Sequence, residues 1–136
     1  MYLLDTNICI YIIKRKPQEV LTTLKEKSKS GIAVSSLTVA ELEYGIEKSD
    51  AKEKNRISLI ELLSIFTIIP FDDRDAAEYG RIRADLERKG RVIREIDMLL
   101  AAQSRCKKLI FVTNNVREFS RVQNLRLENW VNSQGK

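Results

Sequence analysis

The chain has 136 residues, of which 43% are hydrophobic, and its 24 Lys and Arg exceed its 19 Asp and Glu to give a net charge of +5. Because the sequence contains no histidine, a Ser-His-Asp triad, histidine acid-base catalysis and histidine-ligated zinc are excluded, and carboxylates are the groups left for catalysis. The length and composition predict one domain, 1–136, with a full hydrophobic core.

Cysteine usage and hydropathy bear on the cellular compartment. Cys9 and Cys106 lie far apart in apolar segments and form no CxxC motif, which favours buried thiols in a reducing environment. The sequence begins without a basic region followed by a long apolar stretch, and nowhere do about 18 apolar residues run together. We therefore expect neither a signal peptide nor a membrane span. The expected location of the protein is the cytoplasm.

Short β-type runs alternate with longer helical patterns along the chain, which is typical of an α/β domain. The predicted strands are 2–4, 32–35, 66–69, 109–112 and a weaker one at 125–127. The predicted helices are 8–14, 18–27, 39–48, 51–64, 74–89 and 96–107. The first four strands are continuous apolar runs, as expected of parallel strands that are covered on both faces. These features predict a mainly parallel sheet of about five strands.

Polar side chains follow several of these strands at the point where each strand ends. Asp5 follows the first strand, the second leads into a helix that carries Glu41, and the fourth ends in Thr113-Asn114-Asn115. Ligands bind outside the carboxyl ends of the strands in an open parallel sheet. We therefore expect these polar groups to share one rim of the sheet.

The same residues also have purely structural interpretations. Asp5 can cap the helix that follows it, and Thr38 and Glu41 have the spacing of a capping box. Asp97 in a first helical turn complements the helix dipole, and Asn115 is a common turn residue. No one of these residues, taken singly, decides between a structural and a functional role.

Four segments, LLDTN, TVAELEYG, IDMLLAA and VTNNVREF, occur in this order, followed by LRLENW near the C-terminus. Together they resemble the PIN-domain ribonucleases, and within them the VapC-type toxins of bacterial type II toxin-antitoxin pairs. The resemblance covers nearly the whole chain and implies a three-layer α/β/α PIN-like domain with an acidic Mg²⁺ or Mn²⁺ site. It also implies hydrolysis of RNA, particularly tRNA, to 5′-phosphate and 3′-hydroxyl ends, which would inhibit translation until an antitoxin neutralises the toxin.

The resemblance assigns the catalytic and metal-binding acids to Asp5, Glu41 and Asp97. Magnesium prefers oxygen ligands, and a divalent ion would neutralise three carboxylates that otherwise repel one another. Such an ion would polarise a water for attack on phosphorus and stabilise the charge that develops. Asn115 stands where many PIN domains have a fourth acid, so it is included among the catalytic residues as a water-holding partner. The expected supporting residues are Thr6, Asn7, Thr113 and Asn114.

The segment RIRADLERKGRVIR, from 81 to 94, is rich in arginine. Ion pairs at i,i+4, such as Arg81 with Asp85 and Arg83 with Glu87, account for about half of its charge. The cations left unpaired are expected to contact RNA phosphates, and they are Arg88, Lys89 and Arg91.

The approach to Asp97 departs from the family pattern. Relatives often carry Gly or Asn just before this aspartate, whereas this chain has Arg94 and Glu95. Residues two apart on a helix do not face each other, so Glu95 is not expected to add to the site. Arg94 is expected to pair with Glu95 or with an RNA phosphate.

The resemblance implies two protein partners: a second copy in a homodimer, and a VapB-type antitoxin that wraps the toxin and covers the acidic site. Two other functions remain open. A catalytically silent PIN module would bind RNA or a partner protein, and it is favoured by Asn115 and by the altered approach to Asp97. A receiver-like phosphoacceptor domain would need adjacent acids after the first strand, where this chain has Asp5 alone.

Overall fold

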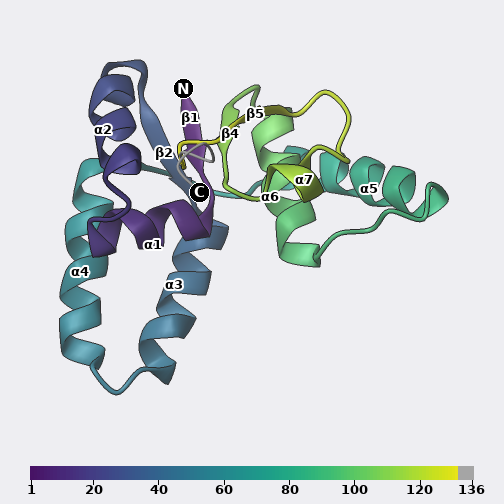
Figure 1. The fold of residues 1–136 in the computed structure, drawn as a ribbon. Coiled ribbons are helices and arrows are strands. Elements are labelled where there is room, and N and C mark those ends of the chain that lie inside the picture. The colour runs from purple at the N-terminus through teal and green to yellow at the C-terminus, as the bar shows by residue number, and fades with distance from the viewer. Residues whose placement is uncertain (132–136) are drawn as a thin grey trace.

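The computed structural model describes residues 1–131, which form three layers, with helices on both faces of a five-stranded sheet (Figure 1). The expected domain, 1–136, extends into 132–136, which lie outside the described residues. The strands are β1 (Tyr2–Leu4), β2 (Ile32–Ser35), β3 (Thr67–Ile69), β4 (Ile110–Val112) and β5 (Arg126–Glu128). The helices are α1 (Thr6–Lys14), α2 (Gln18–Lys27), the 3₁₀ helix η1 (Ser28–Ser30), α3 (Ser36–Lys48), α4 (Lys52–Ile65), α5 (Asp73–Arg88), α6 (Glu95–Cys106) and α7 (Val116–Phe119).

The strand order of the sheet is β3-β2-β1-β4-β5, and every pairing is parallel. The expected three-layer α/β/α fold with a mainly parallel sheet is therefore confirmed, and the described sheet is parallel throughout. The chain builds outward from β1 through β2 to β3, and then returns to place β4 on the other side of β1. This reversal puts the crevice where α/β sheets bind ligands beside the carboxyl end of β1, directly before Asp5.

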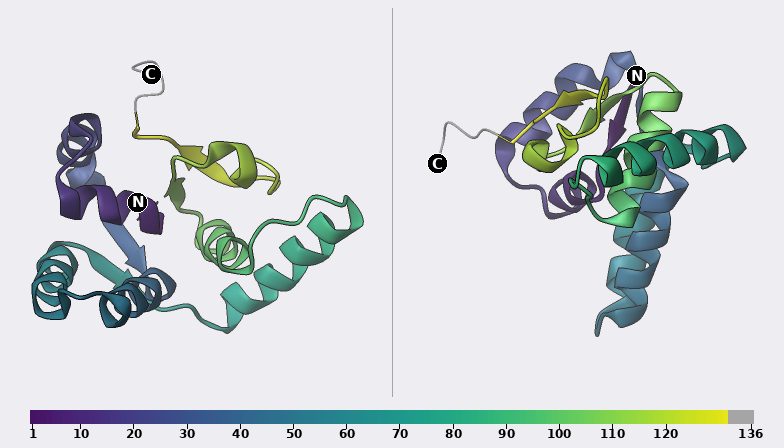
Figure 2. Two further views of the ribbon diagram at one scale, coloured as in Figure 1. Left: turned by 60° about the horizontal axis from the view of Figure 1, so that its bottom comes forward. Right: turned by 90° about the vertical axis from the view of Figure 1, so that its right-hand side faces the viewer.

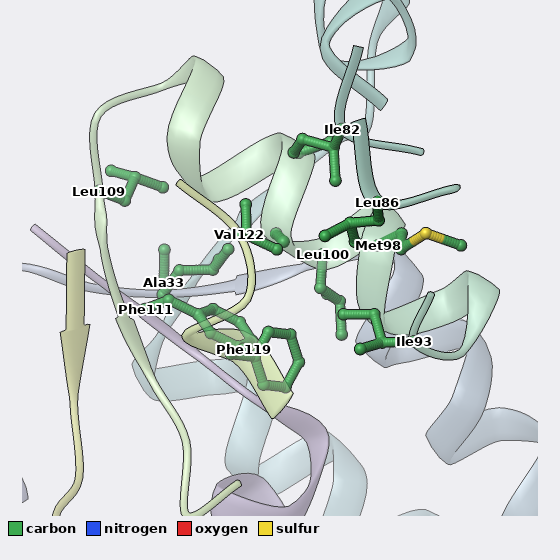
Figure 3. Packing of buried hydrophobic residues seen from close by; sticks show 13 residues of the cluster. Ala33, Ile82, Leu86, Ile93, Met98, Leu100, Leu109, Phe111, Phe119 and Val122 are labelled. Carbon is green, nitrogen blue, oxygen red and sulfur yellow. The ribbon is translucent and has the colours of Figure 1, made fainter. Parts of the chain in front are cut away.

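Helices α1 to α4 lie on one side of the sheet, and α5, α6 and α7 lie on the other (Figures 1 and 2). The strands supply both cores because successive side chains point to opposite faces. Leu3 and Phe111 join the cluster under α5 and α6, whereas Tyr2 and Leu4 join the cluster under α1 and α2. Figure 3 shows the first cluster, in which the Phe111 and Phe119 rings lie 4.7 Å apart between centroids.

Most predicted elements differ from the structure by no more than one or two residues at a boundary, but two expectations about the elements are wrong. The third helix was predicted to begin at 39, but α3 begins at Ser36 because Ser35 is its N-cap, with Ser35 Oγ accepting from the Leu37 N–H at 3.0 Å. Strand β3 was expected to be covered on both faces, but it is the edge strand of the described sheet, and Ile68 is 44% exposed. The short helices η1 and α7 were not predicted.

Within residues 1–131, none of the helices has the length and apolarity to cross a membrane.

Candidate active site

Asp5 lies at the end of the central strand and begins the site. Its N–H donates to the Val112 carbonyl at 2.9 Å, which carries the β1–β4 pairing one residue beyond the strands. Asp5 is 6% exposed and is the N-cap of α1, where Oδ1 accepts from the Thr6 N–H at 2.8 Å. Oδ2 accepts from Thr113 Oγ1 at 2.7 Å. The capping interpretation of Asp5 is therefore confirmed, and its second oxygen is held by the end of β4.

The electrostatic environment of Asp5 favours its protonated form. Burial raises the pKa of the Asp5 carboxyl, the hydrogen bonds from Thr113 and Thr6 oppose that rise, and the charges of Asp97 and Glu41 add to it. The net direction is a raised pKa. Three acids that lie far apart in sequence therefore interact electrostatically in the folded chain.

Glu41 reaches the site from α3 and is held by a side chain of α1. Thr6 Oγ1 donates to Glu41 Oε1 at 2.5 Å and lies 3.2 Å from Thr38 Oγ1. Since Ser35 caps α3, Thr38 is a buried residue inside the helix, and the capping-box interpretation of Thr38 and Glu41 is wrong. The one-turn spacing of Thr38 and Glu41 serves instead to place both side chains beside Thr6.

Asp97 lies in the first turn of α6 and is paired with the N-cap residue of the same helix. Arg94 Nε donates to Asp97 Oδ2 and Arg94 Nη2 donates to Asp97 Oδ1, both at 3.1 Å, so the pair is bidentate. The expected pairing of Arg94 with Glu95 is wrong, because the Glu95 carboxylate instead lies 3.7 Å from Arg83 Nη1. Asp97 itself is 3% exposed.

Asn115 follows β4 and is connected to Asp5 through Thr113. The Asn115 N–H donates to Thr113 Oγ1 at 3.0 Å, so the hydroxyl that donates to Asp5 also accepts from this backbone. The Asn115 amide Nδ2 donates to Glu118 Oε1 at 3.2 Å. Asn114 points elsewhere, donating to the Tyr11 hydroxyl at 3.0 Å.

One cavity of about 460 Å³ joins these groups at the carboxyl edge of the sheet. Its polar lining consists of Asp5, Thr6, Asn7, Glu41, Asn55, Ser58, Arg94, Asp97 and Asn115. Thr113 is buried behind Asp5, and neither it nor Asn114 lines the cavity. Asn55 and Ser58 were not predicted to line the site, since no local signal in α4 shows which of its faces packs toward α1 and α3.

The lining residues suit a divalent cation in donor type. Asp5, Glu41 and Asp97 present carboxylate oxygens to one cavity, and Mg²⁺ and Mn²⁺ prefer oxygen ligands. In residues 1–131 no three acidic, cysteine or histidine side chains are already gathered tightly enough to hold a metal ion. Both oxygens of Asp97 accept hydrogen bonds from Arg94.

Comparison with known proteins places this arrangement in a family. The PIN domain family model matches residues 2–125. The chain belongs to the PIN-domain family. Ribonuclease VapC2 of Haemophilus influenzae is 48% identical over 130 residues, which cover 96% of this chain and 98% of that protein. The tRNA(fMet)-specific endonuclease VapC of Shigella flexneri is 41% identical over 129 residues, covering 95% of this chain and 97% of that protein. Within the PIN-domain family, the chain is thus a VapC homologue.

Solved structures agree with this assignment. The crystal structure of VapBC2 from Rickettsia felis, bound to a DNA fragment from its promoter, contains a chain that matches with a TM-score of 0.91. That chain is 41% identical, and the match covers 96% of this chain and 98% of the other. The resemblance to PIN-domain, VapC-type proteins that the sequence motifs predicted is therefore confirmed.

The basic helix of this PIN domain is more fully paired than expected. Its ion pairs include Arg81 with Glu78, Arg83 with Glu87, Arg88 with Asp85, and Lys89 with Asp85. The prediction that Arg88 and Lys89 lack partners is wrong, because Asp85 lies one helical turn before both, at 3.5 Å from Arg88 Nη2 and 3.0 Å from Lys89 Nζ. Arg91, beyond the end of α5, is exposed.

Proposed function

We propose that this chain is the toxin of a type II toxin-antitoxin pair and an endoribonuclease that depends on Mg²⁺, for which Mn²⁺ can substitute. The observation that carries the proposal is the convergence of Asp5, Glu41 and Asp97 on one cavity at the sheet's topological reversal, in a VapC homologue. The proposed substrate is RNA, and tRNA in particular, because a relative of 41% identity is named as a tRNA(fMet)-specific endonuclease.

Two of the three acids, Asp5 and Glu41, have a structural reason to stay in place while RNA is hydrolysed. Thr113 and the start of α1 fix the two oxygens of Asp5, and Thr6 orients Glu41. When bound, a divalent ion supplies Lewis-acid polarisation and neutralises charge on the scissile phosphate. Attack by water on phosphorus with departure of the 3′ oxygen gives a 5′-phosphate and a 3′-hydroxyl.

The remaining lining residues hold the reactants. The Asn115 side chain offers amide hydrogen-bonding groups at the rim for a water, while its backbone is fixed by Thr113. Apolar side chains from α1, α3, α4 and α7 complete the cavity wall. Arg88, Lys89 and Arg91 are the proposed phosphate contacts of RNA outside the cavity, where they would position the substrate without reading its sequence.

The proposed partners are a second copy of the chain in a homodimer and a VapB-type antitoxin, in the cytoplasm. Structures of related chains are of VapBC complexes, from Rickettsia felis and from Salmonella typhimurium. An antitoxin that brings a basic side chain to the three carboxylates would inhibit by competing with the metal ion for them.

The proposal is tested by incubating purified, antitoxin-free protein with total tRNA in Mg²⁺ and in EDTA, and then mapping the new RNA ends. We expect discrete cuts with 5′-phosphate ends that require the metal and disappear in Asp5→Ala. Asp73→Ala is the matched control, because Asp73 is an exposed aspartate at the start of α5, and this variant should cleave like the wild type.

Two results would contradict the nuclease proposal. Cutting that persists in EDTA or in Asp5→Ala would assign the activity to another site or to a contaminant. Folded wild-type protein that binds RNA and leaves it intact would favour the catalytically silent PIN module.

A further inference from the structure

The pairing of Arg94 with Asp97 brings a positive charge into the cavity proposed to hold a cation. Among the described residues that line this cavity, Arg94 is the single Lys or Arg. Its guanidinium makes two parallel hydrogen bonds, both of 3.1 Å, and so uses both oxygens of the Asp97 carboxylate. A metal ion bound by Asp97 and the Arg94 guanidinium would therefore need the same two carboxylate oxygens.

The two members of the pair differ sharply in exposure. The Asp97 side chain is 5% exposed, whereas that of Arg94 is 70% exposed. Asp97 is held by its place in the first turn of α6, but Arg94 extends from the N-cap position with an extended backbone at φ −60° and ψ 148°. When the Arg94 guanidinium leaves Asp97, the guanidinium enters water, so its departure carries no desolvation cost for Arg94.

The Arg94 guanidinium also interacts electrostatically with the other two acids of the site, Glu41 and Asp5. The hydrogen bonds and charge of Asp97 raise the pKa of Arg94, and the charges of Glu41 and Asp5 add to the rise. Arg94 thus offsets part of the mutual repulsion of three carboxylates, the same electrostatic task that a divalent cation would perform.

We propose that Arg94 is a positioning residue that occupies Asp97 in the metal-free protein and competes with the divalent cation for its two carboxylate oxygens. This inference deepens the proposed function and rests on it, since the competing ion is the proposed catalytic metal. The consequence is a site whose negative charge is partly offset by the chain itself until the metal concentration is high enough to displace Arg94.

Metal affinity tests the proposal directly. Isothermal titration of the purified, antitoxin-free protein with Mn²⁺ should show binding that is about 3- to 10-fold tighter in Arg94→Gln than in the wild type, as expected for removing one competing surface charge. Arg94→Lys should be intermediate, because lysine keeps the charge and lacks the planar fork that bonds both oxygens. Arg117→Gln is the control, as Arg117 is an exposed arginine on α7.

Two results of this titration would overturn the proposal. The first is an Arg94→Gln affinity within twofold of the wild type. The second is a gain in Mn²⁺ affinity in Arg117→Gln that equals the gain in Arg94→Gln. Such a result would mean that the gain reflects net charge rather than competition at Asp97. A circular dichroism melt of each variant confirms that it is folded before the titration.

A second measurement uses the wild-type chain and so does not depend on the folding of a variant. The Nε–H signal of Arg94, assigned in a ¹⁵N spectrum by its absence in Arg94→Gln, should shift and exchange faster with solvent as Mg²⁺ is added. A signal that stays unchanged while Mg²⁺ binds overturns the proposal. Absence of RNA cleavage with the expected affinity change would instead refute the nuclease function and leave the competition intact.

Discussion

At the scale of single residues, Asp5 shows how a site residue can act against stability. It is 6% exposed and lies in the field of two other acids, which together with burial raise the pKa of its carboxyl. Only two hydrogen-bond donors, the Thr6 N–H and the Thr113 hydroxyl, compensate the charge in the described chain. Ionised Asp5 therefore costs folding free energy at neutral pH, where catalysis needs it as a ligand.

Asp5→Asn should therefore stabilise the metal-free protein at pH 7, by about 1 kcal/mol in the free energy of unfolding, while abolishing RNA cleavage. The asparagine Oδ1 can accept from the Thr6 N–H, and its Nδ2 can donate to the Thr113 hydroxyl oxygen. Because the folded-state pKa is raised, the folded state binds more protons between the two pKa values, so the wild type gains stability as the pH falls through that range. The difference in the free energy of unfolding between Asp5→Asn and the wild type should accordingly become smaller as the pH falls.

Urea titrations of both proteins at neutral and mildly acidic pH, in EDTA, measure this gap. Asp73→Asn is the matched control, because Asp73 is exposed and its substitution should change the free energy of unfolding by less than about 0.5 kcal/mol. A less stable Asp5→Asn protein at pH 7 would show that the capping bonds of Asp5 outweigh the cost of its charge.

At the scale of the elements, the site depends on side chains that connect one helix or strand to the next. Thr6 of α1 bonds Glu41 of α3, and Thr113 at the end of β4 bonds Asp5 at the end of β1. Each hydroxyl donates to one oxygen of a carboxylate and so restricts the rotation of that carboxylate. Asp5 and Glu41 are therefore oriented by neutral residues that would not titrate or bind metal themselves.

Thr6→Val should lower the rate of RNA cleavage by about 10- to 100-fold, because the near-isosteric side chain packs as before and loses the hydrogen bond to Glu41. Thr6→Ser, which keeps the hydroxyl, should retain most of the rate. Single-turnover cleavage at saturating Mg²⁺ measures both variants, with thermal melts to compare their stability. A Thr6→Val protein that keeps the wild-type rate, beside a Thr6→Ser protein that loses it, would mean that the threonine methyl group, and not the hydroxyl, is what matters.

At the scale of the whole molecule, the charge is unevenly spread. Helix α5 extends away from the sheet (Figure 2), and Arg88, Lys89 and Arg91 lie at its C-terminal end and just beyond it. Asp85 neutralises part of this cluster, which leaves Arg91 as the most available of the three for a phosphate. A net charge of +5 adds long-range attraction for a polyanion.

RNA binding should therefore weaken with salt, and Arg91→Gln should reduce both the affinity and the slope of log K against log salt, the latter by about 1. Arg88→Gln should have a smaller effect, because Arg88 already contacts Asp85 at 3.5 Å. Filter binding of tRNA to the inactive Asp5→Asn protein over a range of KCl concentrations measures both slopes. A larger effect for Arg88→Gln would show that RNA displaces Asp85 from this helix.

The sequence by itself determined the elements and most of the site's membership. Strands 2–4 and 32–35 and the helix 18–27 were predicted with the bounds that the structure has, since apolar runs and turn residues are local signals of backbone conformation. The motifs around Asp5, Glu41, Asp97 and Asn115 likewise predicted residues that the structure brings to one cavity. Their catalytic roles stay predictions.

Only the tertiary structure decided how those residues are held. Thr113 and Asp5 are 108 positions apart, and Thr6 and Glu41 are 35 apart, so no local pattern could reveal that they form hydrogen bonds. Even the local choice between Ser35 and Thr38 as the cap of α3 depended on where β2 stops pairing with its neighbours. Sequence periodicity encodes which face of an element is buried, whereas contacts between elements depend on strand order and packing, which emerge when the whole chain folds.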